Sequence, residues 1–220
     1  MSAALRLVIF DVDGTLVDSQ DFIVAAMEQA FASEGLQAPE RGEILSIVGL
    51  SLDEAVGRLS GGLRVAAIVA AYRGAFLKLR QAKTEPLYPG VPEMLAELAK
   101  DETLLLGVAT GKARRGLDHI LDTYNLRQFF VTSQVADDHP SKPNPSMVDA
   151  CLRDTGVAAA NTVIIGDTVY DIEMGRAAGI RRIGVSWGYH PAEDLIAAGA
   201  ARVVDEVKAL PAAIAAQWET

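Results

Sequence analysis

A short stretch near the start of the chain constrains the fold more than any other part. Four apolar residues, 7–10 (Leu-Val-Ile-Phe), run directly into the sequence Asp-Val-Asp-Gly-Thr at 11–15. Such a run is typical of a buried central strand of a parallel sheet, and ligands of open α/β sheets bind at the carboxyl ends of these strands. We therefore expect Asp11 at a reaction site. Gly14 would turn the backbone there, so that amides near Gly14 and Thr15 can face an anion.

A second acidic cluster follows another apolar run. The residues 163–165 (Val-Ile-Ile) lead directly into Gly166, Asp167 and Thr168, and Asp171 comes three residues later. Two acidic clusters, each placed directly after an apolar strand, indicate a shared site at one edge of a sheet.

The composition indicates a globular protein. Half of the 220 residues are hydrophobic and 22% are charged, which is typical of a folded chain. The formal net charge of −9 argues against nucleic acid and membranes as partners, since both require basic surfaces. Cys151 is the single cysteine, and no stretch is long enough for a membrane span, so we expect a cytoplasmic protein, monomeric or homodimeric.

The residues between 19 and 83 show only helical patterns. Ser19 is a candidate cap for a helix that Gly35 ends, and the sequence Ser-Leu-Asp-Glu at 51–54 reads as a capping box. An all-helical block between two strands of a sheet indicates an inserted cap domain. We expect a core domain of residues 1–17 and 86–220, and a cap domain of residues 18–85.

From residue 88 onward, strand and helix patterns alternate. Strands are expected at 104–109, 129–132, 163–165 and 182–185, with an edge strand at 201–204 and helices between them. This alternation predicts an α/β fold with a doubly wound, Rossmann-like parallel sheet.

The parallel sheet would gather several chemical groups at one edge. Asp11 and Asp13 follow the first strand, Thr110 follows the strand at 104–109, and Lys142 lies in the proline-rich loop Ser-Lys-Pro-Asn-Pro. Carboxylates that converge, here together with Asp167, repel one another unless a hard cation such as Mg²⁺ compensates them. A metal ion, a lysine and a hydroxyl group are sufficient for phosphoryl transfer, which depends on positioning and charge stabilisation.

These motifs, in this order, resemble those of the haloacid dehalogenase superfamily of phosphohydrolases, in the subfamily with an α-helical cap after the first motif. The resemblance covers essentially the whole chain. It implies that Asp11 is a nucleophile that forms an aspartyl-phosphate, and that Asp13 protonates the leaving oxygen and then activates water. It also implies that Thr110 and Lys142 bind the phosphoryl oxygens.

The same resemblance implies a Mg²⁺ site. Its ligands would be the side chains of Asp11 and Asp167 and the backbone carbonyl of Asp13, with Asp171 supporting a metal-bound water or the loop. The predicted activity is a Mg²⁺-dependent phosphatase acting on a small phosphate monoester.

The substrate contacts are predicted near the cap and after the second motif. Besides Gly14 and Thr15, the candidates are Gly49 in the cap and Gly111, Lys112 and Arg114 in the core. Many relatives carry Asn where this chain has Gly111. The runs 184–189 and 198–200 look like the phosphoglycolate phosphatase branch, which implies 2-phosphoglycolate or a similar short phosphoester as substrate.

Other functions on related scaffolds remain open. A β-phosphoglucomutase-like sugar-phosphate mutase or a pyrophosphatase would keep every core residue. A dehalogenase needs neither a leaving-group acid nor a metal, so Asp13 and Asp167 argue against it. A non-catalytic phospho-binding or signalling protein, such as a receiver domain, lacks a second acid two residues after the acceptor and has no inserted cap.

Overall fold

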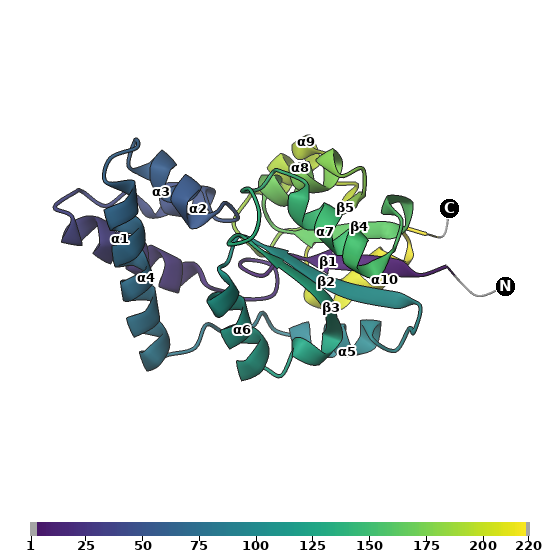
Figure 1. Ribbon diagram of the computed structural model, residues 1–220. Coiled ribbons are helices and arrows are strands. Elements are labelled where there is room, and N and C mark those ends of the chain that lie inside the picture. The colour runs from purple at the N-terminus through teal and green to yellow at the C-terminus, as the bar shows by residue number, and fades with distance from the viewer. Residues whose placement is uncertain (1–3, 219–220) are drawn as a thin grey trace.

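The computed structural model describes residues 4–218 and contains a six-stranded sheet, shown with its helices in Figure 1. The strands, in chain order, are β1 (Arg6–Phe10), β2 (Leu104–Thr110), β3 (Phe130–Val135), β4 (Thr162–Gly166), β5 (Arg181–Val185) and β6 (Arg202–Val204). Their order in the sheet is β3-β2-β1-β4-β5-β6, and each neighbouring pair is parallel. The predicted doubly wound α/β fold is confirmed.

The central position of β1 explains its continuous apolar run. It pairs with β2 on one side and with β4 on the other. Val8 and Phe10 pack into the hydrophobic core on one face of the sheet, and Leu7 and Ile9 into the core on the other face. Because side chains alternate between faces and both faces are covered, every position of this strand must be apolar.

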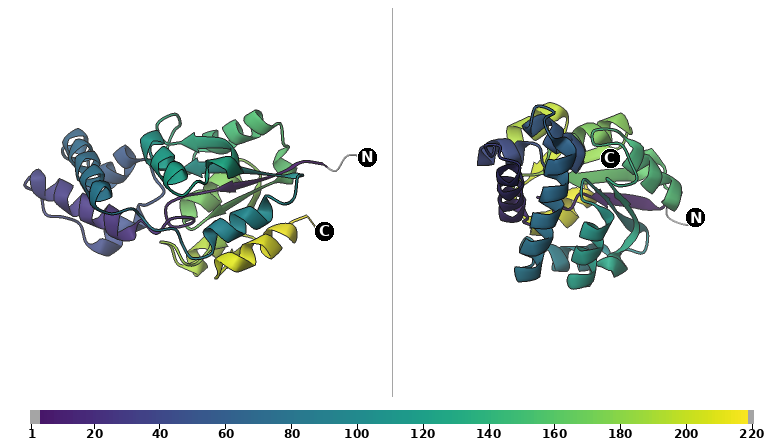
Figure 2. Two further views of the ribbon diagram at one scale, coloured as in Figure 1. Left: turned by 90° about the horizontal axis from the view of Figure 1, so that it is seen from below. Right: turned by 60° about the vertical axis from the view of Figure 1, so that its left-hand side comes forward.

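Helices cover both faces of this sheet. In chain order they are α1 (Gln20–Ser33), α2 (Arg41–Ser46), α3 (Leu52–Leu59), α4 (Val65–Ala82), α5 (Val91–Leu98), α6 (Arg114–Thr123), α7 (Ser146–Thr155), α8 (Val169–Ala177), α9 (Ala192–Ala198) and α10 (Leu210–Ala215). The core on one face contains residues of α5, α6 and α10, whereas the core on the other contains residues of α7 and α8. Figure 2 shows α10, in yellow, beside α5. Among residues 4–218 no helix combines the length and the apolar character needed to cross a bilayer.

Helices α1 to α4 lie together beyond the carboxyl ends of the strands (Figure 1), and we call these four helices the cap. They share a hydrophobic cluster of their own, which includes Met27, Phe31, Ile44 and Ile68. Helix α1 packs mainly against α4. The boundaries of a separate domain at 18–85 stay a prediction.

Two chain segments connect the cap to the core, and they are hydrogen-bonded to each other. The Asp18 N–H donates to the Pro86 carbonyl at 2.8 Å, and the Tyr88 N–H donates to the Leu16 carbonyl at 3.0 Å. The two connections therefore form one paired crossing.

The capping predictions for α1 and α3 were correct in position but wrong in chemistry. Ser19 and Ser51 are the N-cap residues, yet neither side chain caps its helix. The Ser19 hydroxyl instead donates to Asp13 at 2.5 Å, and the Ser51 N–H donates to the Ser141 hydroxyl at 2.8 Å. At Ser19 the tertiary partner outcompetes the local cap, because a charged acceptor gives a stronger hydrogen bond than a helix amide offers.

The cluster within the cap leads to a stability prediction. Ile68 is fully buried there, so Ile68→Ala should lower the free energy of unfolding by about 2–5 kcal/mol. The control Leu63→Ala removes a cap leucine that is 61% exposed and should change little. Urea unfolding measures the free energy of unfolding of both variants, and hydrogen exchange reports the protection of α1 and α4 in each. Equal effects of the two substitutions would contradict the assignment of this cluster.

Candidate active site

The predicted chemical groups meet at the carboxyl edge of the sheet. Asp11 directly follows β1, Thr110 ends β2, and Asp167 directly follows β4. Lys142 reaches them from the loop between β3 and α7. Because β1 lies between β2 and β4, residues separated by more than 150 positions become neighbours.

Three buried carboxylates form the centre of the site. Oxygen atoms of Asp11, Asp167 and Asp171 all lie within 4.8 Å of one another, and all three residues are buried. Burial raises the pKa of Asp11 to about 7, although the charge of Lys142 opposes this shift. Burial and the neighbouring charges of Asp11 and Asp171 likewise raise the pKa of Asp167 well above its ordinary value.

This cluster fits a hard divalent cation. Both carboxylate oxygens of Asp11 are buried; the Lys142 ammonium lies beside Oδ1, and Oδ2 has no hydrogen-bond partner among residues 4–218. Buried carboxylate oxygens without donors are costly, and an all-oxygen set is the kind that binds Mg²⁺. The Asp13 carboxylate is not part of this cluster. The metal contact predicted for Asp13 is through its backbone carbonyl, and it stays a prediction.

Lys142 is the buried cation of the site. Its Nζ lies 2.9 Å from Oδ1 of Asp11 and 2.6 Å from Oδ1 of Asp171. Burial lowers the pKa of this amine, but the two carboxylates outweigh it and raise the pKa above its ordinary value. Lys142 therefore keeps its charge, and it positions Asp11 and Asp171 relative to each other.

Asp167 is fixed by the first motif and by the loop after β5. The Thr15 hydroxyl donates to its Oδ1 at 2.8 Å, and the Tyr189 N–H donates to its Oδ2 at 3.0 Å. At Gly14, where φ is +84°, a Cβ atom would lie 2.1 Å from Oδ2 of Asp167. Only glycine fits there. The structure thus places Gly14 and Thr15, predicted as substrate contacts, against a carboxylate of the acidic cluster.

Asp171 has a second role in the start of α8. Its Oδ2 accepts hydrogen bonds from the Thr168 hydroxyl at 2.7 Å and from the Thr168 N–H at 3.2 Å. The bond from the Thr168 N–H is one half of a capping box of α8, in which the Thr168 side chain accepts from the Asp171 N–H in return. The carboxylate is therefore held from one side by the helix and from the other by Lys142.

Asp13 lies beside the cluster in a chain of charges that sequence reasoning missed. Lys112 Nζ is 2.8 Å from Oδ1 of Asp13 and 3.3 Å from Oε1 of Glu85. Arg80 binds the same Glu85 carboxylate with two hydrogen bonds, at 2.7 and 2.9 Å. This chain of alternating charges runs from the core, through the connection between core and cap, to the end of α4.

Glu85 is fully buried in this chain. Burial raises its pKa, but the hydrogen bond from Arg80 and the charge of Lys112 outweigh burial and lower it below the ordinary value. No local pattern marks Glu85, because its partners Arg80 and Lys112 come from the end of α4 and from the loop between β2 and α6. A pair separated by 27 positions is recognisable only in the fold.

A cavity of about 400 Å³ lies between the cap and the core. Asp11, Asp13 and Thr110 line its floor, and the predicted residues Gly49, Gly111 and Lys112 line its walls. A Cβ atom at Gly111 would lie 2.7 Å from the carbonyl oxygens of Gly49 and Leu50. The absence of a side chain at residue 111 therefore lets the cap loop rest directly on the core.

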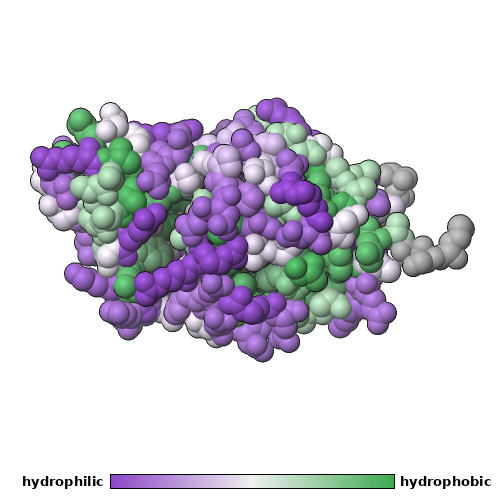
Figure 3. All heavy atoms as spheres, viewed as in Figure 1, coloured by the Kyte–Doolittle hydropathy of each residue, from purple (hydrophilic) through white to green (hydrophobic). Residues whose placement is uncertain are grey.

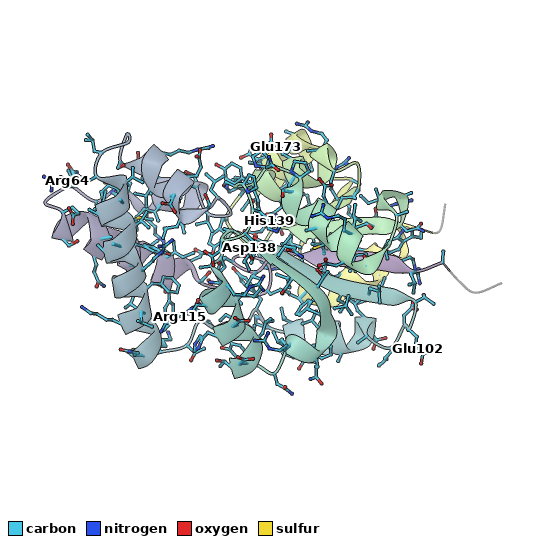
Figure 4. All side chains as sticks on the ribbon, viewed as in Figure 1. Arg64, Glu102, Arg115, Asp138, His139 and Glu173 are labelled. Atoms are coloured by element: carbon cyan, nitrogen blue, oxygen red, sulfur yellow. The ribbon has the colours of Figure 1, made fainter. Side chains whose placement is uncertain are left out.

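Arg114 is the predicted substrate contact that the structure places elsewhere. Its guanidinium donates to the Ser133 hydroxyl at 2.8 Å and to the Ser133 carbonyl at 2.9 Å, and it lies outside the cavity lining. The next residue, Arg115, lines the cavity and lies between α4 and α6 in Figure 4. On a helix, a step of one residue turns a side chain by about 100°, which separates these two arginines.

Comparison with known proteins places this site in a family. A family model described as haloacid dehalogenase-like hydrolase matches residues 8–185. A hydrolase from Pseudomonas syringae has a similar structure, with a TM-score of 0.85 and 25% sequence identity, covering 96% of this chain and 98% of that chain.

Similar curated proteins have names of phosphatases. Probable phosphatase IndB of Dickeya dadantii is 36% identical over 206 residues, which are 90% of this chain and 89% of that protein. An N-acetylmuramic acid 6-phosphate phosphatase of Pseudomonas putida is 32% identical over 218 residues, covering 91% and 92% of the two chains. A phosphoglycolate phosphatase of the same species is 27% identical over 215 residues, covering 93% and 78%.

The charge chain leads to a prediction with a defined pH dependence. Glu85→Gln should lower the free energy of unfolding at pH 7 by about 3 kcal/mol, because Arg80 and Lys112 lose a buried anionic partner. The lowered pKa of Glu85 means that its stabilisation is complete above the ordinary value of 4.5 and is lost as pH falls through the folded-state pKa. The difference between wild type and variant should therefore shrink below about pH 4.5.

Urea unfolding from pH 3 to pH 8 tests this prediction. The matched control is Glu97→Gln, which changes an exposed glutamate paired with Lys100 and should have little effect at any pH. A difference for Glu85→Gln that is constant across this range would contradict the assigned ion pairs.

Proposed function

Because the chain belongs to the haloacid dehalogenase-like hydrolases, we propose that it hydrolyses phosphate monoesters through a phosphorylated Asp11. The observation that carries the proposal is the state of the Asp11 carboxylate. It directly follows the central strand, lines the cavity, and has two buried oxygens, of which Oδ1 is paired with Lys142 and Oδ2 has no hydrogen-bond donor among the described residues. A carboxylate that Lys142 holds at one oxygen and that has no donor at the other is suited to act as a nucleophile in a pre-organised site.

The proposed metal site uses the side chains of Asp11, Asp167 and Asp171, whose oxygens already converge. When bound, Mg²⁺ would supply positive charge against the anionic phosphoryl group. The chain itself supplies Lys142, which stays charged and holds Asp11 and Asp171 in place. Thr110 is fully buried, and its Oγ1 accepts the Lys112 N–H at 3.2 Å, which leaves its own proton free for a phosphoryl oxygen.

The proposed reaction has two displacements at phosphorus. An oxygen of Asp11 attacks, the bond from phosphorus to the ester oxygen breaks, and the departing alkoxide takes a proton from Asp13. A water molecule then attacks the phosphoryl-aspartate and gives its proton to Asp13. The bond from phosphorus to Asp11 breaks, and the products are inorganic phosphate and the free carboxylate.

The surroundings of Asp13 support its role in proton transfer. The Ser19 hydroxyl donates to its Oδ1 at 2.5 Å, and Lys112 lies 2.8 Å from the same oxygen. Both contacts meet Oδ1, and the residue lines the cavity. Oδ2 is thus the oxygen suited to exchange a proton with the substrate.

The identity of the alcohol is the finer part of the proposal. The sequence predicts 2-phosphoglycolate, and relatives with that name are 27–29% identical, whereas those named for N-acetylmuramic acid 6-phosphate are 31–32% identical. These names include both a very small and a bulky acid. Both compounds are phosphate monoesters, so the reaction type does not distinguish them. The shape and polarity of the cavity must do so.

The role of Asp11 has a direct test. Asp11→Asn should lower kcat for 4-nitrophenyl phosphate by at least about a thousandfold, since an amide is a poor nucleophile. Thermal unfolding should show that the variant remains folded. Asp122→Asn, a change of an exposed aspartate on α6, should leave kcat unchanged. Substantial turnover by Asp11→Asn would refute the nucleophile.

The metal site has a test that does not depend on activity. Mg²⁺ at about a hundred times its dissociation constant should stabilise the wild-type protein by about 2.7 kcal/mol, and Asp167→Asn should remove most of this effect. EDTA should abolish turnover, and added Mg²⁺ should restore it. A melting temperature that is the same with and without Mg²⁺ would contradict the proposed ligands.

A further inference from the structure

The cavity differs sharply between its floor and its roof. The core supplies a polar floor around Asp11 and Asp13, whereas the cap supplies mostly apolar side chains. The apolar part of the lining includes Ile23, Met27, Val48, Leu50, Tyr72 and Phe76. Figure 3 shows hydrophobic surface in the hollow between cap and core, with hydrophilic side chains around it.

The volume is large for a small leaving group. At about 400 Å³, the cavity falls in the range of about 300–1,000 Å³ that is typical of sites for drug-sized ligands. Glycolate would add only five non-hydrogen atoms to the phosphoryl group. Such a ligand would leave apolar walls facing water or empty space, and both are unfavourable.

The charged side chains in the interior of the cavity are already paired, whereas Asp53 and Arg73, which also line it 3.9 Å apart, are exposed to solvent. Lys112 and Arg80 both line it, but Lys112 contacts Asp13 and Glu85, and Arg80 binds Glu85 through two hydrogen bonds. A carboxylate on the leaving group would have to displace one of these anions. Arg115 makes no ion pair among the residues that the structure describes, but it is exposed at the edge of the cavity rather than in its interior.

Few uncommitted hydrogen-bonding groups remain on the cap side. The hydroxyls of Tyr72 and Ser51 line the cavity and make no hydrogen bond within residues 4–218. Burial raises the pKa of Tyr72, so it is a neutral donor. A site that recognises a sugar or a polyol normally offers several such groups.

Two aromatic rings form one wall of the cavity. Tyr72 and Phe76 lie on successive turns of α4, with ring centroids 5.6 Å apart. Arg80 and Lys112 lie over the Phe76 ring, at 4.8 and 5.5 Å from its centroid. The two ring planes are inclined at 34°, and together with the cations packed on Phe76 they form a pre-organised aromatic wall against which another ring can pack.

We infer that the alcohol part of the substrate is bulky and largely apolar, with an aromatic ring that packs against Tyr72 and Phe76. This inference rests on the proposed phosphatase function and specifies its substrate class. The core performs the phosphoryl chemistry, and the apolar cap selects the alcohol by the area of contact.

A comparison of four substrates tests the inference. They are ethyl phosphate, 2-phenylethyl phosphate, 2-phosphoglycolate and N-acetylmuramic acid 6-phosphate. The first two release simple primary alcohols of similar leaving ability, so the ratio of their kcat/KM values reports on contacts with the cavity rather than on the chemical step. The value of kcat/KM for 2-phenylethyl phosphate should exceed each of the other three by at least tenfold. A preference for either acidic substrate, or equal values for the ethyl and phenylethyl esters, would overturn the inference.

The variant Phe76→Ala localises the effect. It should lower the ratio of kcat/KM for 2-phenylethyl phosphate to kcat/KM for ethyl phosphate by at least tenfold, mainly through KM of the phenylethyl ester. Leu63→Ala, a change of an exposed cap residue, is the control and should alter neither. Equal losses for both esters in Phe76→Ala would contradict a contact with the ring.

A second variant keeps the test decisive if Phe76→Ala fails to fold. Val48→Phe reduces the cavity volume and should abolish the preference for the phenylethyl ester, while turnover of ethyl phosphate shows that the protein is intact. Retention of that preference would count against the inference. If 4-nitrophenyl phosphate and all four esters are inert with wild-type protein and Mg²⁺, the proposed phosphatase function itself falls.

Discussion

The burial of negative charge at the carboxyl end of the central strand is the constraint on which this structure depends. Three carboxylates lie within 4.8 Å of one another, shielded from water, with Lys142 as their buried cation. Burying such charges destabilises the folded state unless each one is held by hydrogen-bond donors or by a counter-ion. The surrounding chain supplies these contacts through Thr15, the Tyr189 N–H and the capping box of α8. The oxygens of Asp11, which among the described residues are paired only with Lys142, are those assigned to metal and substrate.

A second layer of charge couples the cap to this centre. Asp13, Lys112, Glu85 and Arg80 alternate in sign from the first motif to the end of α4. Glu85 lies next to the paired crossing of the two connections, where the Pro86 carbonyl accepts the Asp18 N–H. The residue assigned to proton transfer and the orientation of the last cap helix therefore share one network of ion pairs.

This arrangement separates chemistry from recognition. Because the interior cations are neutralised by their own partners, the cavity presents paired charges at its base and an apolar wall above. Gly111 allows the cap loop to rest on the core without an intervening side chain, which closes the cavity at that point. The charged residues of the core and the apolar residues of the cap can change independently in sequence. One hydrolytic scaffold can in this way act on phosphate esters of different alcohols.

The local sequence alone determined the architecture and the chemical centre. A short apolar run that ends in acids is typical of a strand buried on both faces, and parallel strands bring their carboxyl ends together. For this reason the fold and the proximity of Asp11, Asp167 and Lys142 followed from motif order. The tertiary structure decided what depends on distant partners: the Ser19 hydroxyl turned from its helix to Asp13, Arg114 turned to Ser133, and Glu85 became a buried bridge. The volume of the cavity could not be predicted from the sequence either. It depends on how far the packed surface of the cap lies from that of the core, and no local pattern encodes that distance.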